Sequence, residues 1–363
     1  EAPEPAEPGP DWQRIRPILA GICGSDLATV AGKSSRFFEP IVSFPFVPGH
    51  EIVGTTEDGV RVVVEPVLGC AAREIEPPCP ACAGGSLGRC EHLTLGHLKP
   101  GLQTGYCSDT GGGWSTALVA HASQIHRVPE ALCDEAAVMV EPAACAVHAA
   151  LRARVPGGGL VAVLGAGTLG LCVVAALRRF ALPGTVIAGA KHPDQQREAR
   201  RLGADVVVAP GELKRAVRRA ARCQVVGERL SGGADVVLDC VGNAASIHEA
   251  LAITKPGGRV VLVGMPGPER LDLAPLWQRE IELVGAYAYG TEELPDGRSA
   301  RTFDLAFELS AAAELGRLVS ARYPLERYRE AIEHAASAGA RGAVKIVFEP
   351  QAQRVQAAKE KRT

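Results

Sequence analysis

The stretch Val161-Ala-Val-Leu-Gly165-Ala-Gly167-Thr-Leu-Gly170 decides the fold of this 363-residue chain. Its first four residues are typical of a buried strand, and the glycines follow with the spacing G-x-G-x-x-G before an apolar segment, Leu169–Phe180, that predicts a helix. In such a unit Gly165 permits a tight turn, Gly167 lets backbone N–H groups approach a pyrophosphate, and Gly170 allows close helix–strand packing. The stretch therefore favours a dinucleotide site over glycines that only close a turn.

The same region also has to be tested as a membrane span, because Leu160–Leu177 is 18 residues without a charge. Its glycines and β-branched start favour a strand and a helix instead. Further on, apolar runs alternate with helix-like stretches such as Pro193–Leu202 and Ala244–Ile253. The runs are Val161–Leu164, Thr185–Ala188, Asp205–Val208, Ala234–Leu238, Arg259–Val263 and Ile281–Val284. Repeated strand–helix units predict an α/β fold with a doubly wound parallel sheet.

The residues before this region have a different sequence pattern, which predicts a second, mostly β domain. From about Ile18 to Ala150, short β-branched runs alternate with turns rich in glycine and proline. A chain of this length is expected to form about two domains. We predict boundaries at 1–150, 151–285 and 286–363, the last being a return to the first domain plus a tail. That part has helical stretches at Phe303–Val319 and Leu325–Ala338 and a strand at Ala343–Phe348.

The amino-acid composition excludes several classes of function. With 39 Lys+Arg and 41 Asp+Glu the net charge is −2, so the chain has no basic field for nucleic acid or an anionic membrane. Eleven cysteines are too few and odd in number for a secreted disulfide scaffold, which favours reduced thiols and some metal ligands. No export signal opens the chain, so a cytoplasmic location is the default expectation.

Three short motifs place metal-ligand side chains next to turns or a helix start. They are Gly21-Ile-Cys23-Gly-Ser25-Asp26, Gly49-His50-Glu51 and Val140-Glu141-Pro142. Each is ambiguous alone, because a buried cysteine is more often a small hydrophobe than a ligand. Their occurrence together ahead of a dinucleotide fold favours a metal site.

Together with GAGTLG, these motifs make the chain resemble the zinc-dependent medium-chain dehydrogenase/reductase family, the alcohol dehydrogenases. The motifs that carry the resemblance are GICGSD, PGHE, VEPAACAVHA, GAGTLG, DCVG (Asp239–Gly242) and GAVKIVF. They run from about Pro8 to Pro350, and the polyol and threonine dehydrogenase branch is the nearest pattern. The resemblance implies a GroES-like catalytic domain, a Rossmann domain, two zinc ions per chain, and a homodimer or homotetramer that acts on a small-molecule alcohol or ketone.

The resemblance also implies roles at the catalytic zinc. Cys23 and His50 would bind it together with either Glu51 or Glu141, leaving one open position. Asp26 would orient the histidine, and Ser25 would pass on the proton of the alcohol. Relatives continue that relay through a histidine a few residues later, but here Leu27-Ala28 follow Asp26. The proton would leave through ribose and water, or through a distant histidine such as His148.

A second cysteine cluster predicts a structural zinc. Its pattern is Cys70-x8-Cys79-x2-Cys82-x7-Cys90, whereas the family reads C-x2-C-x2-C-x7-C, which puts Glu76 in the first position. Cys70 or Glu76 therefore completes the site. The rival interpretation is a redox C-x-x-C, but no thioredoxin-like strand–helix–strand unit follows it.

The end of the second predicted strand bears on the cofactor. NAD sites usually have an acid about 20 residues after the glycine loop, and here Gly189 stands there, with no carboxylate before Asp194. This favours NADP over NAD, with a 2′-phosphate near basic side chains, of which Lys191, His192 and Arg197 are available. The expected cofactor residues are Gly165, Gly167, Thr168, Leu169, Gly170, Lys191 and Arg197.

These patterns predict reversible hydride transfer between a secondary alcohol, polyol or sugar-type hydroxyl and NAD(P). Two alternatives stay open: reduction of a ketone or aldehyde as the physiological direction, and a non-catalytic zinc- and NADPH-binding protein. The substrate is not readable from the sequence. Phe37, Phe38, Trp114 and Tyr287 are candidate pocket residues that could equally be core or subunit contacts.

Overall fold

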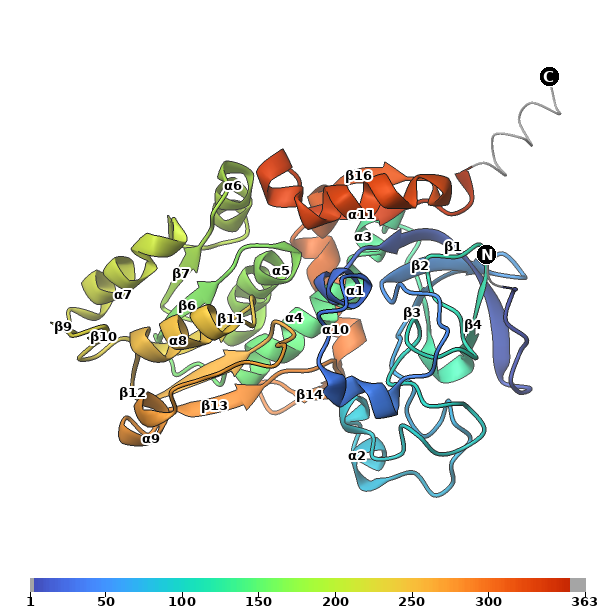
Figure 1. Ribbon diagram of the computed structural model, residues 1–363, viewed down its shortest axis with the longest axis horizontal. Helices are drawn as coiled ribbons and strands as arrows, with labels where there is room; N and C mark the ends of the chain where they lie inside the picture. Colours follow the sequence, from blue (N-terminus) through green and yellow to red (C-terminus); the bar gives the residue numbers. More distant parts are fainter. Residues whose placement is uncertain (1–2, 353–363) are drawn as a thin grey trace.

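The computed structural model describes residues 3–352, so residues 353–363 of the predicted tail lie outside it. Figure 1 shows two lobes, one coloured mainly from blue to cyan and the other from green to orange. Each lobe is built on its own sheet.

The green-to-orange lobe contains six parallel strands in the order β13-β12-β11-β6-β7-β8. These are β6 Leu160–Leu164, β7 Thr185–Gly189, β8 Val206–Val208, β11 Ala234–Asp239, β12 Thr254–Leu262 and β13 Glu282–Gly285. The first strand in sequence lies in the middle, so the strand order reverses beside it. This is the doubly wound arrangement, and the predicted fold class is confirmed.

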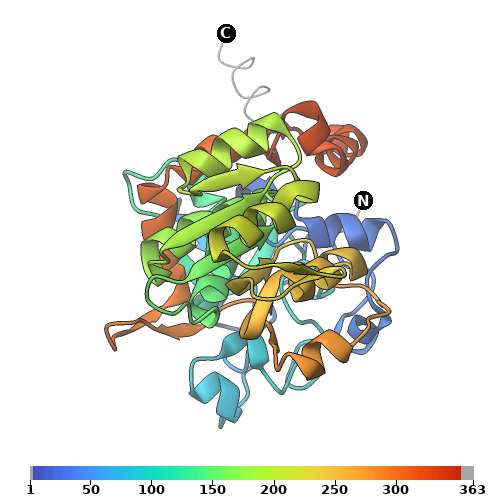
Figure 2. The ribbon, with the colours of Figure 1, turned by 90° about the vertical axis from the view of Figure 1, so that its left-hand side faces the viewer.

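Helices cover both faces of this sheet, as β6 demonstrates. Val161 and Val163 pack in one apolar cluster, whereas Ala162 and Leu164 pack in another. The first cluster holds helix α5 (Thr168–Ala176), and the second holds α7 (Leu213–Ala221) and α8 (Ala244–Ile253). Figure 2 views this lobe from its outer side.

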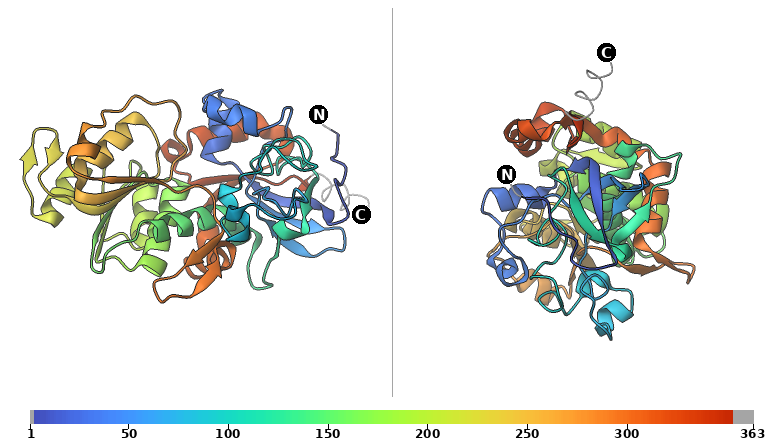
Figure 3. Two further views of the ribbon diagram at one scale, coloured as in Figure 1. Left: turned by 90° about the horizontal axis from the view of Figure 1, so that it is seen from below. Right: turned by 90° about the vertical axis from the view of Figure 1, so that its right-hand side faces the viewer.

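The other sheet has seven strands, six of them in the order β16-β17-β1-β2-β3-β5, with β4 paired to β1. They are β1 Trp12–Gly21, β2 Ile52–Thr56, β3 Arg61–Val64, β4 Leu118–His121, β5 Ile125–Arg127, β16 Val319–Tyr323 and β17 Lys345–Phe348. The last two come from the end of the chain, so residues from both ends of the chain share one sheet. Figure 3 shows the red C-terminal elements beside the blue N-terminal ones, where α11 (Tyr328–Ala336) contacts α1 (Gly24–Val30).

Further helices complete the two lobes. They are α2 Pro80–Ala83, α3 Asp134–Ala137, α4 Val140–Arg152, α6 Pro193–Arg201, α9 Ala274–Gln278 and α10 Thr302–Ala312, and two short hairpins are formed by β9 Val225–Val226 with β10 Arg229–Leu230 and β14 Thr291–Glu293 with β15 Ser299–Arg301. Helix α4 packs against both α5 and α10. Helix α4 therefore lies between the helix that follows β6 and helix α10, which precedes the two C-terminal strands of the other sheet.

Two predicted helices are shorter than expected. The stretch Phe303–Val319 is not one helix, because α10 ends at Ala312 and Glu314 adopts a left-handed conformation with φ of 48° before a short 3₁₀ turn. Leu325–Ala338 likewise divides into a 3₁₀ turn and α11. Apolar periodicity alone does not reveal such breaks, because it continues through them.

The apolar run Leu160–Leu177 divides between β6 and α5, as the strand–helix interpretation predicted. Within residues 3–352, no helix combines the length and the apolar character that crossing a membrane requires.

Candidate zinc and cofactor sites

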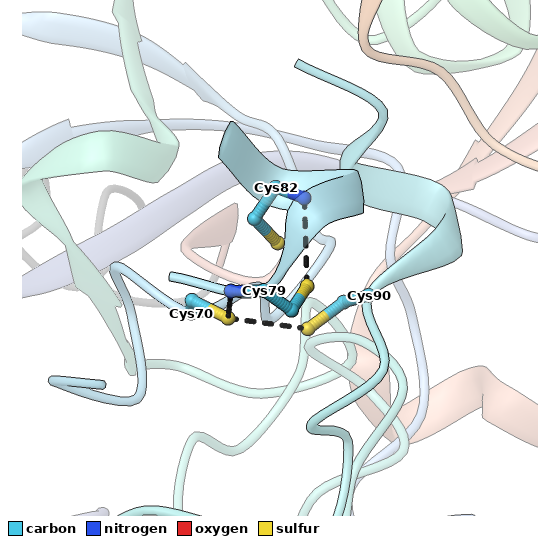
Figure 4. A group of neighbouring side chains, drawn as sticks. All are labelled: Cys70, Cys79, Cys82 and Cys90. Carbon is cyan, nitrogen blue, oxygen red and sulfur yellow. Dashed lines mark hydrogen bonds between the residues drawn. The ribbon is translucent and has the colours of Figure 1, made fainter. Parts of the chain in front are cut away.

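The second cysteine cluster forms a compact group in a lobe around α2. The sulfur atoms of Cys70, Cys79, Cys82 and Cys90 all lie within 4.8 Å of one another. Figure 4 shows the four side chains converging, with the Cys70 and Cys90 sulfurs 3.7 Å apart. The structure thus brings Cys70 into the group, and Glu76 is not part of it.

The chemistry of this group suits zinc. Burial raises the pKa of the Cys79 thiol, but backbone N–H donors of Glu91 and Cys82 outweigh burial and lower it to about 6. Burial raises the pKa of Cys90 to about 11. Four cysteine sulfurs within 4.8 Å of one another are the ligand set of a closed structural zinc site.

The predicted catalytic residues begin at the N-terminus of α1. Cys23 precedes this helix, and its backbone N–H donates to Asp26 Oδ2 at 3.0 Å. The other oxygen, Asp26 Oδ1, lies 3.3 Å from His50 Nδ1, in the turn before β2. Both side chains are buried. Burial lowers the pKa of His50, but the Asp26 carboxylate outweighs it and raises that pKa well above its ordinary value.

Asp26 Oδ1 and His50 Nδ1 face each other without a well-aligned hydrogen bond. A cation bound at the other ring nitrogen would make Nδ1–H a stronger donor to the carboxylate and so satisfy both buried atoms. Cys23 is near enough to act on the pKa of His50 by hydrogen bonding and charge. The chemistry of these three residues therefore fits a metal site.

The two candidate glutamates have different partners. The Glu51 carboxylate is paired with the Lys345 ammonium, and both side chains are buried. Lys345 also donates to the Ile22 carbonyl at 3.1 Å. Glu141, in the first turn of α4, instead accepts from the hydroxyl of Tyr289 at 3.2 Å and has no basic partner among residues 3–352. Burial raises the pKa of Glu141 to about 7.

Sequence reasoning missed Lys345 as a neighbour of the site. Its signal was a charged residue in the middle of the apolar run GAVKIVF, because a fully buried lysine needs a partner. The four candidate ligands Cys23, His50, Glu51 and Glu141 are not as tightly grouped as the four cysteines, which alone meet the 4.8 Å spacing in the described part of the chain.

The glycine loop has the geometry that its spacing predicts. Gly165 follows β6 with φ of +87°, and a Cβ on Gly170 would collide with the Gly165 carbonyl. A Cβ on Gly167 would meet no atom within 4 Å. Helix α5 begins at Thr168 without a side-chain cap, which leaves its first N–H groups for an anion. Thr168 Oγ1 also donates to the Val344 carbonyl at 3.2 Å.

The basic residues near the end of β7 are not equivalent. Lys191 is exposed and has no carboxylate within ion-pair distance in residues 3–352. Arg197, on α6, is paired with Asp194 at 2.5 Å and lies 3.6 Å from Glu198. Asp194 is the first carboxylate after β7, and its ion pair with Arg197 means that neither side chain is without a partner.

Two pocket candidates and the distant histidine have structural partners. Trp114 Nε1 donates to the Gly21 carbonyl at 3.1 Å and its ring packs on Phe348, which makes it a packing residue. Tyr287 is 48% exposed, and its hydroxyl lies 3.5 Å from Gln103 Oε1. His148 is paired with Glu292 at 2.6 Å.

The other two pocket candidates, Phe37 and Phe38, are not held by such partners. Phe37 and Phe38 lie in a 3₁₀ turn at Arg36–Ile41 and meet edge to face, and Phe37 is 75% exposed. Neither ring is held by the core, so this turn is available to a substrate or to another chain.

Comparisons with known proteins agree with this architecture. Residues 9–130 match the model of the alcohol dehydrogenase GroES-like domain, and residues 168–301 match that of the zinc-binding dehydrogenases. A sorbitol dehydrogenase of Arabidopsis thaliana is 30% identical over 94% of this chain and 89% of its own length. An L-idonate 5-dehydrogenase of Vitis vinifera is 29% identical over 94% of this chain and 88% of its own.

A solved structure matches over a similar range. It is a provisionally named zinc-binding dehydrogenase of Sinorhizobium meliloti 1021 bound to NADP, 25% identical, with a TM-score of 0.72 over 95% of this chain and 94% of that one. The GroES-like and Rossmann domains predicted from the motifs are thus confirmed. With both domain models matched in order and relatives similar over almost their whole length, the chain belongs to the zinc-dependent alcohol dehydrogenases of the medium-chain dehydrogenase/reductase family.

Proposed function

We propose that this protein is a zinc-dependent, NADP-preferring dehydrogenase that moves a hydride between a polyol or other secondary alcohol and the nicotinamide. The observation that carries the proposal is the buried Asp26–His50 pair beside Cys23, in a chain that also holds the uncapped glycine loop of a nucleotide site. We place it in the cytoplasm as a homodimer or homotetramer, with domains at 1–150, 151–285 and 286–363.

We assign the catalytic zinc to Cys23, His50 and Glu141, with Glu51 as the alternative third ligand. Glu51 is already paired with the Lys345 ammonium, whereas Glu141 has only neutral hydrogen-bond donors, so a bound cation would be what balances its charge. Zinc there would polarise the alcohol oxygen and lower its pKa. Asp26 holds the ring of His50, and Ser25 accepts the proton of the alcohol.

The preference for NADP is supported at the end of β7. Gly189 replaces the usual acid that binds a ribose 2′-hydroxyl, and Lys191 has no carboxylate partner within residues 3–352. We assign the cofactor to Gly165, Gly167, Thr168, Leu169, Gly170, Lys191 and Arg197. Since Arg197 is engaged by Asp194, Lys191 is the residue that we expect to discriminate. The Sinorhizobium neighbour, solved with NADP, supports the same choice.

The substrate class follows from the relatives, which are named for sorbitol and L-idonate. The test is turnover of sorbitol, xylitol, L-idonate and 2,3-butanediol with NADP and with NAD, together with reduction of the matching ketones. We expect oxidation of at least one polyol, a higher kcat/KM with NADP, and two zinc ions per chain. Two bound zinc ions and NADPH binding without turnover in either direction would instead indicate the non-catalytic alternative.

A matched pair of variants tests the cofactor assignment. Lys191→Ala should raise the KM for NADP with little effect on that for NAD, because only NADP carries the 2′-phosphate. Lys255→Ala is the control, since this lysine pairs with Asp235 on β11. Equal effects of Lys191→Ala on both cofactors would contradict the assignment.

A further inference from the structure

The net charge of −2 conceals an uneven distribution of charge along the chain. Residues 211–230 carry six basic side chains and two acidic ones, so the other residues together are more acidic than the total indicates. This segment contains helix α7 and the β9–β10 hairpin. Figure 1 shows both at the end of the glycine-loop lobe that is farthest from the other lobe. A partner bound there would not cover the other lobe.

Helix α7 has one buried face and one basic face. Leu213 and Val217, one turn apart, are buried in an apolar cluster of the sheet. The exposed residues at i, i+3, i+4 and i+7 are Arg215, Arg218, Arg219 and Arg222. The helix contains no carboxylate, and within residues 3–352 none of these four arginines lies within ion-pair distance of one. Like charges at these spacings repel each other, so the basic face weakens the helix that carries it.

The preceding helix is built differently. Helix α6 also carries three arginines, but two of them are paired within the helix. Arg197 lies 2.5 Å from Asp194, and Arg201 lies 2.7 Å from Glu198. Such pairs balance the charge locally and stabilise a helix. The unpaired face of α7 is therefore not simply a result of the chain's many arginines.

The β9–β10 hairpin adds apolar side chains next to the basic face. Val225 and Val226 form β9, and their exposed fractions are 50% and 48%. Adjacent residues of a strand point to opposite faces, so both faces of the hairpin are open to solvent. Leu230 anchors the hairpin in the same apolar cluster as α7. The hairpin begins at the end of α7, where Cys223 N–H donates to the Arg218 carbonyl at 3.2 Å.

We propose that the basic face of α7 and the β9–β10 hairpin form a docking surface for a bilayer that contains anionic phospholipids. The arginines lie against the anionic headgroups, and Val225 and Val226 enter the boundary between headgroups and acyl chains. Cationic and apolar side chains exposed together are typical of segments that lie on a membrane without crossing it. The inference goes beyond the proposed dehydrogenase function and does not depend on it.

The two valines favour a bilayer over nucleic acid, the other large polyanion. Nucleic acids are bound through their phosphates and through bases that stack on aromatic rings or hydrogen-bond to polar groups, and valine supplies none of these contacts. Residues 211–230 contain no aromatic side chain. The net charge of the whole chain does not oppose local docking, because exposed charges more than about 8 Å away are largely screened at physiological salt.

The experiment measures how the full chain partitions onto sedimented vesicles of phosphatidylcholine, with and without an equimolar share of phosphatidylglycerol, at about 0.1 M and about 1 M NaCl. One variant, Arg215→Gln with Arg219→Gln, removes two charges and keeps residues that favour a helix. A second, Val225→Thr with Val226→Thr, keeps β-branched side chains in β9. All proteins are also titrated with duplex DNA and with single-stranded RNA.

The matched control is Arg89→Gln with Arg127→Gln, which replaces two exposed arginines of the other lobe. Neither lies within ion-pair distance of a carboxylate in the described part of the chain, so the control changes the net charge as the α7 variant does. Thermal unfolding and zinc content are measured for every variant. Both should match wild type, because all six side chains are on the surface.

We expect wild type to bind the vesicles that contain phosphatidylglycerol at about 0.1 M NaCl, and to bind neither those of phosphatidylcholine alone nor any at about 1 M NaCl. Each arginine at an anionic surface strengthens partitioning about fivefold, so Arg215→Gln with Arg219→Gln should weaken it about 25-fold. The valine variant should weaken it about fivefold, because less apolar area enters the bilayer. The control should change it by about twofold at most.

No binding of wild type to the anionic vesicles would overturn the proposal. So would equal losses in the α7 variant and the control, because partitioning would then follow net charge and not this surface. Tighter binding to DNA or RNA than to vesicles, weakened by the arginine variant and not by the valine variant, would assign the surface to nucleic acid instead. Vesicle binding without turnover of any alcohol would refute the proposed function alone, since neither variant changes a residue assigned to zinc or cofactor.

Discussion

Replacing Arg73 is the best test of what stabilises the segment that carries the four clustered cysteines, Cys70 to Cys90. Its side chain is fully buried, and its guanidinium makes six hydrogen bonds to backbone carbonyls. The acceptors are the carbonyls of Leu68, Leu95, Leu98, Lys99 and Gly101, at 2.6 to 3.4 Å. One side chain thus links Leu68, just before the first of the four cysteines, to residues 95–101, which follow the last one.

The magnitude follows from the acceptors that Arg73→Met would leave unpaired. Three of the hydrogen bonds, to Leu68, Leu98 and Gly101, are fully buried. Each buried carbonyl without a partner costs ~1–3 kcal/mol, and water entering the loop offsets part of that, so we expect a loss of about 3–5 kcal/mol. Arg73→Lys should lose about 2 kcal/mol, since one ammonium cannot replace the guanidinium fork.

The assay measures the rate at which one zinc ion is transferred to a colorimetric chelator, which reports local opening of the cysteine cluster. Global unfolding is less suitable, because a two-domain chain need not unfold in one step. A loss of about 3–5 kcal/mol in local stability corresponds to faster release by about two to four orders of magnitude. The control is Arg89→Met, an exposed arginine of the same lobe. If Arg73→Met released zinc within threefold of wild type, the stabilising role of Arg73 would be wrong.

Three further outcomes are expected. Cys70→Ser should lower the zinc content from two ions to one, whereas Glu76→Gln should keep both; the reverse pattern, by elemental analysis, would contradict the cysteine cluster. Lys345→Met should destabilise the seven-stranded sheet by about 3–5 kcal/mol because Glu51 is left buried and unpaired. The measurement is the midpoint of the urea transition that this variant shifts, and Glu51→Gln in the same chain should recover most of the shift. Burial opposes the lowered pKa of Asp235, but a lysine ammonium and a backbone N–H outweigh it. Its stabilisation is therefore full above the ordinary aspartate pKa and lost as pH falls through the lower folded value, so Asp235→Asn should flatten the acid side of a thermal-stability profile.

The nucleotide half was predictable because its signals are local. Gly165 and Gly170 are required by a turn and a close contact within six residues of each other, and the strands around them are continuous apolar runs. The break after Ala312 was not predictable, because Glu314 enters the left-handed region with no glycine to announce it. The choice of Cys70 over Glu76 was also open, since spacing alone does not say how the intervening loop folds back.

The sequence by itself was enough to predict the family and the two kinds of domain, and it supplied the glycine loop and the candidate ligands, because each is carried by residues adjacent in the chain. Only the tertiary structure decided their partners. Lys345 meets Glu51 across 294 residues, and Tyr106 meets Thr29 across 77. Such pairs form because strands from both ends of the chain share one sheet and because a loop folds over the last turn of α1. The partner of each polar group is then distant in the sequence, and spacing along the chain does not predict it.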